Sequence, residues 1–127
     1  KAAYEASDGE IVYLDFMPRA FAEGAAYYYS SRGNRLGWTN QVVAWSQLEL
    51  VKYNVTNIMK GMEKPYLVVT GENAWSRPSS WEIFEAVPHD NKEMVVVPMA
   101  SHFDMYDLAP FVDQAFEAIE PFFGRTL

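Results

Sequence analysis

Two polar residues that suit acid–base chemistry follow the two most apolar runs of the chain. Glu72 comes after the run at 66–70, and His102 comes after the run at 95–97. Continuous apolar runs of this kind are typical of strands buried on both faces of a parallel sheet. Polar groups at the carboxyl ends of such strands form the active sites of open α/β folds. A carboxylate after one strand and a histidine after the next match the last two members of a nucleophile–acid–histidine triad.

The nucleophile of such a triad is missing from the sequence. A nucleophile elbow needs Gly-x-Ser-x-Gly or a close variant, because its strained turn requires small neighbours. The glycine pair with that spacing, Gly33 and Gly37, encloses Arg35, and the chain contains no cysteine. We therefore expect the nucleophile to lie outside these 127 residues.

Aromatic residues stand beside both candidates. Trp75 lies in the turn that follows the first strand, and Phe103 follows His102 directly. Their side chains would either line an acyl pocket or pack in the core, and both alternatives stay open at this point.

The other polar residues of this region have plainer expected roles. Asp104 and Asp107 are expected to cap the final helix, because acidic residues stabilise helix N-termini. His89, beside Asp90, is expected at the surface. With two histidines and no cysteine, no metal site is expected. Without a phosphate-binding glycine loop, no cofactor is expected either.

The composition is that of a globular domain. Hydrophobic residues make up 50% and charged residues 21%, which argues against a disordered chain. The net charge of -7 argues against nucleic acids and anionic membranes as partners. No run reaches the roughly 18 apolar residues of a membrane-spanning helix. The absence of cysteine excludes disulfides but leaves the compartment open.

The second part of the chain, 63–127, has the pattern of a βαβα unit. A helix at 81–86, capped by Ser79 or Ser80, separates the two strands, and the connection is long enough for a parallel crossover. A right-handed βαβ unit follows from that length. A long amphipathic helix at 107–123 carries its apolar residues on one face and ends at Gly124.

The first part, 1–62, is less regular and is rich in aromatic residues and glycine. A short extended piece is expected at 11–16, and a helix opened by Pro18 is expected to run through Tyr28. Another helix is expected at 41–53, where apolar residues recur every three positions.

The number of strands is too small for a complete sheet. Parallel sheets need several strands with helices on both faces. We therefore expect an α/β chain that is incomplete as a stand-alone sheet, with the remaining strands on another chain or a missing segment.

Several of these segments resemble the C-terminal half of an α/β-hydrolase. The resemblance rests on the residues at 64–71, on Arg77-Pro78, on the residues at 92–98 and on the histidine loop at 101–107. The subgroup is the dienelactone-hydrolase-like and peptidase-like set that includes fungal polyketide-processing hydrolases. Upstream, the residues at 27–29, 32–33 and 38–40 resemble the lid-and-helix region of that subgroup.

The resemblance implies both a fold and an activity. The fold is a mostly parallel sheet with flanking and lid helices, of which this chain supplies the last two strands, with 1–62 as the lid region. The activity is cleavage or transfer of ester-type or thioester-type acyl groups through a covalent acyl-enzyme. His102 would be general base toward the nucleophile and then general acid toward the leaving group. The implied partners are an N-terminal half that carries the nucleophile and a small apolar acyl substrate.

One departure from the subgroup concerns the triad acid. Its members commonly carry an aspartate at the position of Ala74 or Trp75, and neither residue can orient an imidazole as a carboxylate does. Glu72 is the nearest acid, and its longer side chain would reach from an earlier position in the turn. An acid supplied elsewhere, or lost, is the alternative.

Two functions of other classes also stay open. The chain would bind an apolar ligand without catalysis if the triad has decayed at Ala74 and Trp75. It would be an interaction module if its exposed sheet edge recruits a partner strand, and a homodimer is the related alternative.

Overall fold

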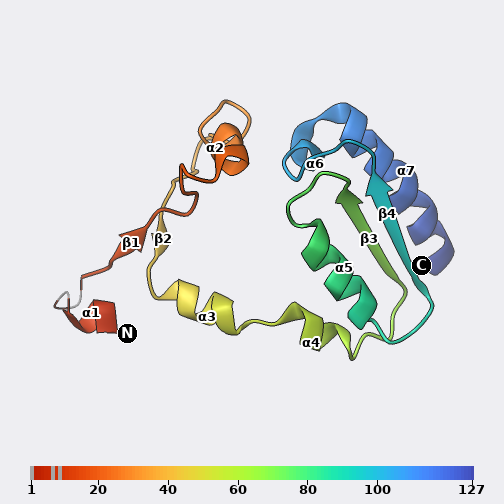
Figure 1. Ribbon diagram of the computed structural model, residues 1–127, viewed down its shortest axis with the longest axis horizontal. Helices are drawn as coiled ribbons and strands as arrows, with labels where there is room; N and C mark the ends of the chain where they lie inside the picture. Colours follow the sequence, from red (N-terminus) through yellow and green to blue (C-terminus); the bar gives the residue numbers. More distant parts are fainter. Residues whose placement is uncertain (1, 7, 9) are drawn as a thin grey trace. The chain divides into compact units, whose positions relative to one another are not determined.

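The computed structural model describes residues 2–6, 8 and 10–127 (Figure 1). The chain divides into two compact units, Lys1–Asn54 and Val55–Leu127. This division assigns 55–62 to the second unit, whereas the sequence-based scheme joined them to the first part. That 1–62 acts as a lid stays a prediction.

The first unit contains a small antiparallel ladder in which β1 pairs with β2. The predicted helix at 41–53 is wrong in its first half, because Val42 and Val43 pair with Leu14 and Tyr13 as a strand. Adjacent β-branched residues favour this extended pairing over helix. The elements of the unit are α1 (Ala2–Ala6), β1 (Tyr13–Leu14), α2 (Ala22–Tyr28), β2 (Val42–Val43) and α3 (Ser46–Lys52).

Asn40 joins distant parts of the first unit. Its Oδ1 accepts a hydrogen bond from the Met17 backbone N–H at 2.6 Å, and its Nδ2 donates to the Tyr29 hydroxyl at 2.6 Å. Beside it, the rings of Tyr28 and Trp38 are stacked with centroids 5.6 Å apart. Tyr28, Tyr29 and Trp38 of this unit therefore pack on one another.

The second unit is built on a parallel strand pair. Strand β3 pairs with β4 from Tyr66↔Lys92 to Gly71↔Val97, which confirms the predicted parallel crossover. Helix α5 packs against β3, and α7 packs against both strands (Figure 1). The elements are α4 (Val55–Met59), β3 (Tyr66–Gly71), α5 (Arg77–Ala86), β4 (Lys92–Val97), α6 (Asp104–Asp107) and α7 (Ala109–Thr126).

Most residues of the two strands are half-buried, so the expectation of strands buried on both faces is wrong for this chain. Only Thr70 and Gly71 of β3 and Val97 of β4 are buried. The physical reason is the size of the sheet: within the described ranges it has two strands, so each has an outer edge without a partner.

Helix α5 begins earlier than the predicted helix, at Arg77. Pro78 lies in its first turn, where the fixed φ of proline favours a helix start. At the other end, Lys92 Nζ donates hydrogen bonds to the carbonyl oxygens of Phe84 and Val87, both at 2.9 Å. The first residue of β4 therefore caps the helix that precedes it.

The predicted final helix is two helices. Leu108 is extended, with φ -86° and ψ 109°, and separates α6 from α7. Pro110 favours this break, because proline suits the first turn of a helix and its ring would clash with a preceding helical turn. Gly124 does not end α7, which continues to Thr126. No described helix is long and apolar enough to cross a membrane.

Candidate active site

The loops that follow β3 and β4 are joined by hydrogen bonds. The Glu72 N–H donates to the Val97 carbonyl and the Asn73 N–H donates to the Ala100 carbonyl, both at 2.9 Å. The Asn73 side chain donates to the Met99 carbonyl at 3.0 Å. These bonds hold the carboxyl ends of the two strands together and fix the segments that carry Ser76 and His102.

Gly71 allows this close approach. A Cβ atom at this position would overlap the backbone carbonyl of Ala100. Both residues are buried, so neither backbone has space to yield. A glycine at the end of β3 is therefore required by packing of backbone on backbone.

A reciprocal pair of hydrogen bonds fixes the histidine loop. The Ser101 N–H donates to Asp104 Oδ2 at 3.0 Å, and the Asp104 N–H donates to Ser101 Oγ at 3.3 Å. This pair lies at the start of α6 and not at the start of α7, the final helix that Asp104 was expected to cap. Asp107 is the last residue of α6 and precedes Leu108, the N-cap of α7, so its role in capping the final helix stays a prediction.

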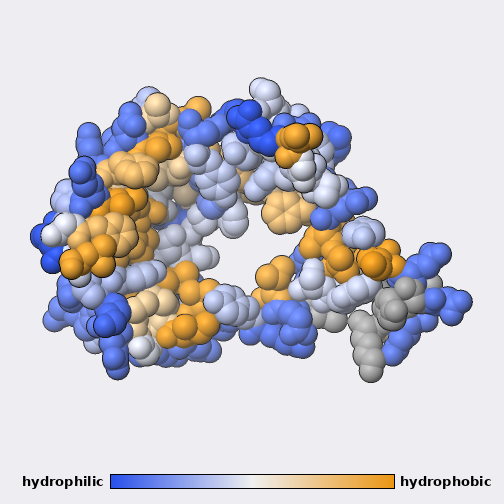
Figure 2. Space-filling model, turned by 180° about the vertical axis from the view of Figure 1, so that it is seen from behind, coloured by the Kyte–Doolittle hydropathy of each residue, from blue (hydrophilic) through white to orange (hydrophobic). Residues whose placement is uncertain are grey.

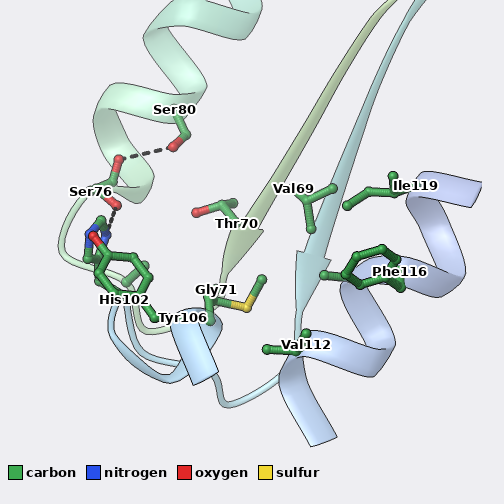
Figure 3. Close-up of a pocket in the computed structure, with 13 residues that line it drawn as sticks. Val69, Thr70, Gly71, Ser76, Ser80, His102, Tyr106, Val112, Phe116 and Ile119 are labelled. Carbon is green, nitrogen blue, oxygen red and sulfur yellow. Dashed lines mark hydrogen bonds between the residues drawn. The ribbon is translucent and has the colours of Figure 1, made fainter. Parts of the chain in front are cut away.

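Both ring nitrogens of His102 are hydrogen-bonded to hydroxyl groups. Figure 3 shows the bond to Ser76. Nδ1 lies 2.7 Å from Ser76 Oγ, and Nε2 lies 2.8 Å from the Tyr106 hydroxyl. Ser76 immediately precedes α5, and Tyr106 belongs to α6, one turn beyond the histidine. The imidazole is therefore held between two elements of the second unit.

Glu72 does not contact the imidazole in the part of the chain that the structure describes. Its Oε2 accepts a hydrogen bond from the Met99 backbone N–H at 2.8 Å. Met99 has a φ of 60°, a conformation that costs energy for a residue with a side chain. The geometry expected of a triad acid is therefore not found at Glu72, which instead stabilises the loop before His102.

The two aromatic candidates differ in position. The Trp75 ring lies 4.9 Å from the His102 ring and is 56% exposed, so it covers the imidazole from the solvent side. Phe103 is only 3% exposed and packs edge-to-face against His102 at 5.0 Å. Phe103 is thus a core residue beneath the histidine, and its role in lining an acyl pocket stays a prediction.

A cavity of about 430 Å³ opens beside His102. Its polar end is formed by His102 with Ser76 and Ser80, and its apolar end lies between β3 and α7 (Figure 3). The apolar side chains that line it include Val69, Val112, Phe116 and Ile119.

A second cavity of about 440 Å³ continues along β3 and shares Val69 and Ile119 with the first. Burial raises the pKa of the Tyr66 phenol in its wall. Both cavities are lined by residues of β3 and not of β4, so they follow the edge of β3 that faces away from its partner strand. Figure 2 shows the hydrophobic residues that gather over this unit.

The second histidine is not the surface residue that was expected. His89 is half-buried, and neither ring nitrogen has a hydrogen-bond partner among the described residues. Within the same residues, no group of three or more His, Cys, Asp or Glu side chains could hold a metal ion.

Sequence reasoning missed Ser76 and Tyr106. The signal for Tyr106 was its spacing of four residues from His102 on a helical turn, which places side chains on one face. The signal for Ser76 was its place directly after Trp75, where the subgroup's aspartate was sought.

Comparisons with known proteins identify relatives without assigned functions. No protein-family model matches the chain. The uncharacterized protein YcjY of Escherichia coli K12 is 26% identical over 88 residues, which cover 69% of this chain and 26% of that protein. The uncharacterized protein PA2218 of Pseudomonas aeruginosa is 32% identical over 105 residues, which cover 80% of this chain and 28% of that protein.

The crystal structure of the hypothetical protein PA2218 superposes with a TM-score of 0.78 at 26% identity. The superposition covers 99% of this chain and 42% of the crystallised one. The chain therefore spans less than half of the length of these relatives. This mixed α/β chain with its small parallel sheet is similar to one part of the YcjY and PA2218 proteins.

Proposed function

We propose that this chain is the histidine-bearing part of an α/β-hydrolase that cleaves or transfers ester-type or thioester-type acyl groups. The observation that carries the proposal is the setting of His102. It follows the carboxyl end of a parallel strand, one ring nitrogen is held by Ser76, and the ring stands at the polar end of an apolar cavity. This is the setting of a general base in an open α/β active site.

The two ring nitrogens have separate roles in the proposed mechanism. With the proton on Nδ1, the ring donates to Ser76 Oγ and leaves Nε2 as the base. Nε2 then accepts a hydrogen bond from the Tyr106 hydroxyl, on a side chain that is 50% exposed. A nucleophilic hydroxyl or thiol would replace that phenol, lose its proton to Nε2 and attack the acyl carbonyl. The resulting imidazolium would protonate the leaving group.

The cavity suits a small apolar acyl group. Its volume of about 430 Å³ lies at the lower end of the range for small-molecule sites. Val112, Phe116 and Ile119 would contact the acyl chain, while the polar end would hold the reacting carbonyl beside His102. No described group in this cavity requires a charged substrate.

A segment beyond this chain would complete the site by pairing with the free edge of β3 along the second cavity, and would leave the cavity beside His102 open to the acyl group. Phe116 and Phe123 of α7 line the two cavities along that edge and are 61% and 50% exposed. Apolar side chains beside an unpaired strand favour strand addition. The relatives are several times longer than the matched region, and their remaining length is ample for the nucleophile-bearing strands.

The test is to trap the acyl-enzyme in the complete protein, meaning this chain together with the segment that carries the nucleophile. The protein is mixed with p-nitrophenyl esters of increasing acyl length and with matching thioesters, and is quenched in the first turnover. Intact mass and peptide mapping should find one acyl group, on a serine or cysteine outside residues 1–127. Absence of turnover and of any adduct across the series would contradict the proposal.

Non-catalytic ligand binding is the second candidate. It is favoured by one observation: the partner of His102 Nδ1 is a hydroxyl rather than a carboxylate. In that case the complete protein would bind fatty acids or esters in the cavity and release them unchanged.

A further inference from the structure

We infer that Ser76 is a positioning residue for His102, occupying the place at Nδ1 that a carboxylate takes in a triad. The inference rests on the proposed function. It differs from the sequence-based expectation, which placed an acid, Glu72, at the ring; the Glu72 carboxylate accepts the Met99 N–H instead.

The hydroxyl of Ser76 is committed to the imidazole. Ser76 stands at the N-cap position of α5, where a serine side chain ordinarily bonds a backbone N–H of the first turn. Here it makes no such cap hydrogen bond. Its backbone angles, φ -83° and ψ -5°, are helical rather than extended, and Oγ lies 2.7 Å from His102 Nδ1 instead.

The backbone of Ser76 is held from two sides. Its carbonyl oxygen accepts hydrogen bonds from the Ser80 N–H at 3.0 Å and from Ser80 Oγ at 3.2 Å. On the other side, the Arg77 N–H donates to the Ala74 carbonyl at 3.0 Å. The side chain is half-buried in the cavity wall. A partner fixed in this way can select one orientation of the ring.

A hydroxyl supplies only part of what a triad acid supplies. As an acceptor it favours the tautomer with the proton on Nδ1 and fixes the ring plane, which keeps Nε2 available as the base. Because it carries no negative charge, it does not stabilise the imidazolium as a carboxylate does. We therefore expect a smaller effect on its removal than the roughly 10,000-fold loss seen for a triad aspartate.

The test compares four variants of the complete protein. Ser76→Ala removes the hydroxyl, Ser76→Thr keeps it, and Ser76→Asp adds a charge. Ser79→Ala, at an exposed serine of α5, is the matched control. Since the Ser76 side chain does not cap α5, the alanine variant should fold. If the alanine variant does not fold, the threonine and aspartate variants still test the inference.

The expected result is a loss in kcat of about tenfold for Ser76→Ala, the worth of one neutral hydrogen bond, at little change in KM. Ser76→Thr should keep most of the wild-type kcat, and Ser79→Ala should leave kcat unchanged.

The tautomer and the pH profile give a second readout. NMR of the ring nitrogens should show a smaller fraction of His102 with the proton on Nδ1 in Ser76→Ala. In Ser76→Asp the acid limb of kcat/KM should move to higher pH, because the carboxylate stabilises the imidazolium. Tyr106 is the other titratable group that bonds the ring.

Two outcomes would overturn the inference. Equal activity and equal tautomer populations in Ser76→Ala and Ser79→Ala would mean that Ser76 does not position the ring. An acyl adduct mapped to Ser76 itself would make it the nucleophile rather than a positioning residue. If His102→Ala also leaves turnover intact, the proposed function fails, whatever Ser76 does.

Discussion

Glu72 binds the backbone of Met99: its carboxylate accepts the Met99 N–H at 2.8 Å, and Met99 is held at a φ of 60°. The contact joins the loop after β3 to the loop after β4 and lies before His102 in the chain. Glu72 thus acts on the backbone that carries the histidine rather than on the imidazole.

Glu72→Gln is therefore expected to keep near-normal turnover, because an amide oxygen can accept the same hydrogen bond. Glu72→Ala should lower the free energy of unfolding by about 1 kcal/mol through the lost bond. Steady-state kinetics and thermal unfolding measure the two effects. A large loss of turnover in Glu72→Gln at unchanged stability would restore Glu72 as the triad acid.

Replacing Gly71 or Gly124 by alanine should change the stability of the protein in opposite directions. A Cβ at Gly71 would overlap the Ala100 carbonyl, so Gly71→Ala should destabilise the protein by roughly 2 kcal/mol. At Gly124, an exposed position within α7, no atom lies within 4 Å of the new Cβ. Gly124→Ala should stabilise by up to about 1 kcal/mol through helix propensity. Equal melting temperatures for the two variants would show that the strand ends are not in close contact.

Tyr106→Phe should leave turnover within about threefold of the wild type. The substitution keeps the ring contacts with His102 and Phe103, at 5.2 and 5.3 Å, and removes the phenol from Nε2. Losing one neutral hydrogen bond in the resting state costs little, and the base is then free for the nucleophile. If Tyr106→Phe is as inactive as a variant without the imidazole, the phenol takes part in the chemistry and the proposed role of Nε2 is wrong.

The isolated chain should associate or precipitate, because the free edge of β3 and the phenylalanines of α7 are exposed. Replacing Phe116 and Phe123 by lysine should raise its solubility, and should weaken its capture of the complementary segment. Leu36→Lys, at an exposed apolar residue of the first unit, is the control. Sedimentation that finds a compact monomer, unaffected by these changes, would contradict a missing strand and favour a self-sufficient module.

The strands and the position of His102 could be predicted from the sequence because they depend on local signals. Runs of β-branched residues bounded by polar turns define β3 and β4, and a parallel crossover follows from the length between them. The start of α7 also has a signal in the sequence, since Pro110 lies in its first turn, where proline favours a helix start.

The contact of His102 with Ser76 could not be predicted, because it joins segments that are distant in the chain. Ser76 and His102 are 26 positions apart, and their contact depends on how the two loops are bonded. The β1–β2 ladder was missed for the same reason: two-residue strands have almost no local signal, and tertiary pairing decides them.

The central claim is that the His102 imidazole is the general base for acyl transfer, and it is tested most directly by comparing His102→Ala with His89→Ala in the complete protein. His89 is the matched control, because its ring nitrogens have no hydrogen-bond partner in the described part of the chain. Turnover of the best ester or thioester substrate should fall by about 100- to 10,000-fold or more in His102→Ala, with an unchanged circular dichroism spectrum. It should stay near the wild-type value in His89→Ala. Equal and small effects of the two substitutions would contradict the claim.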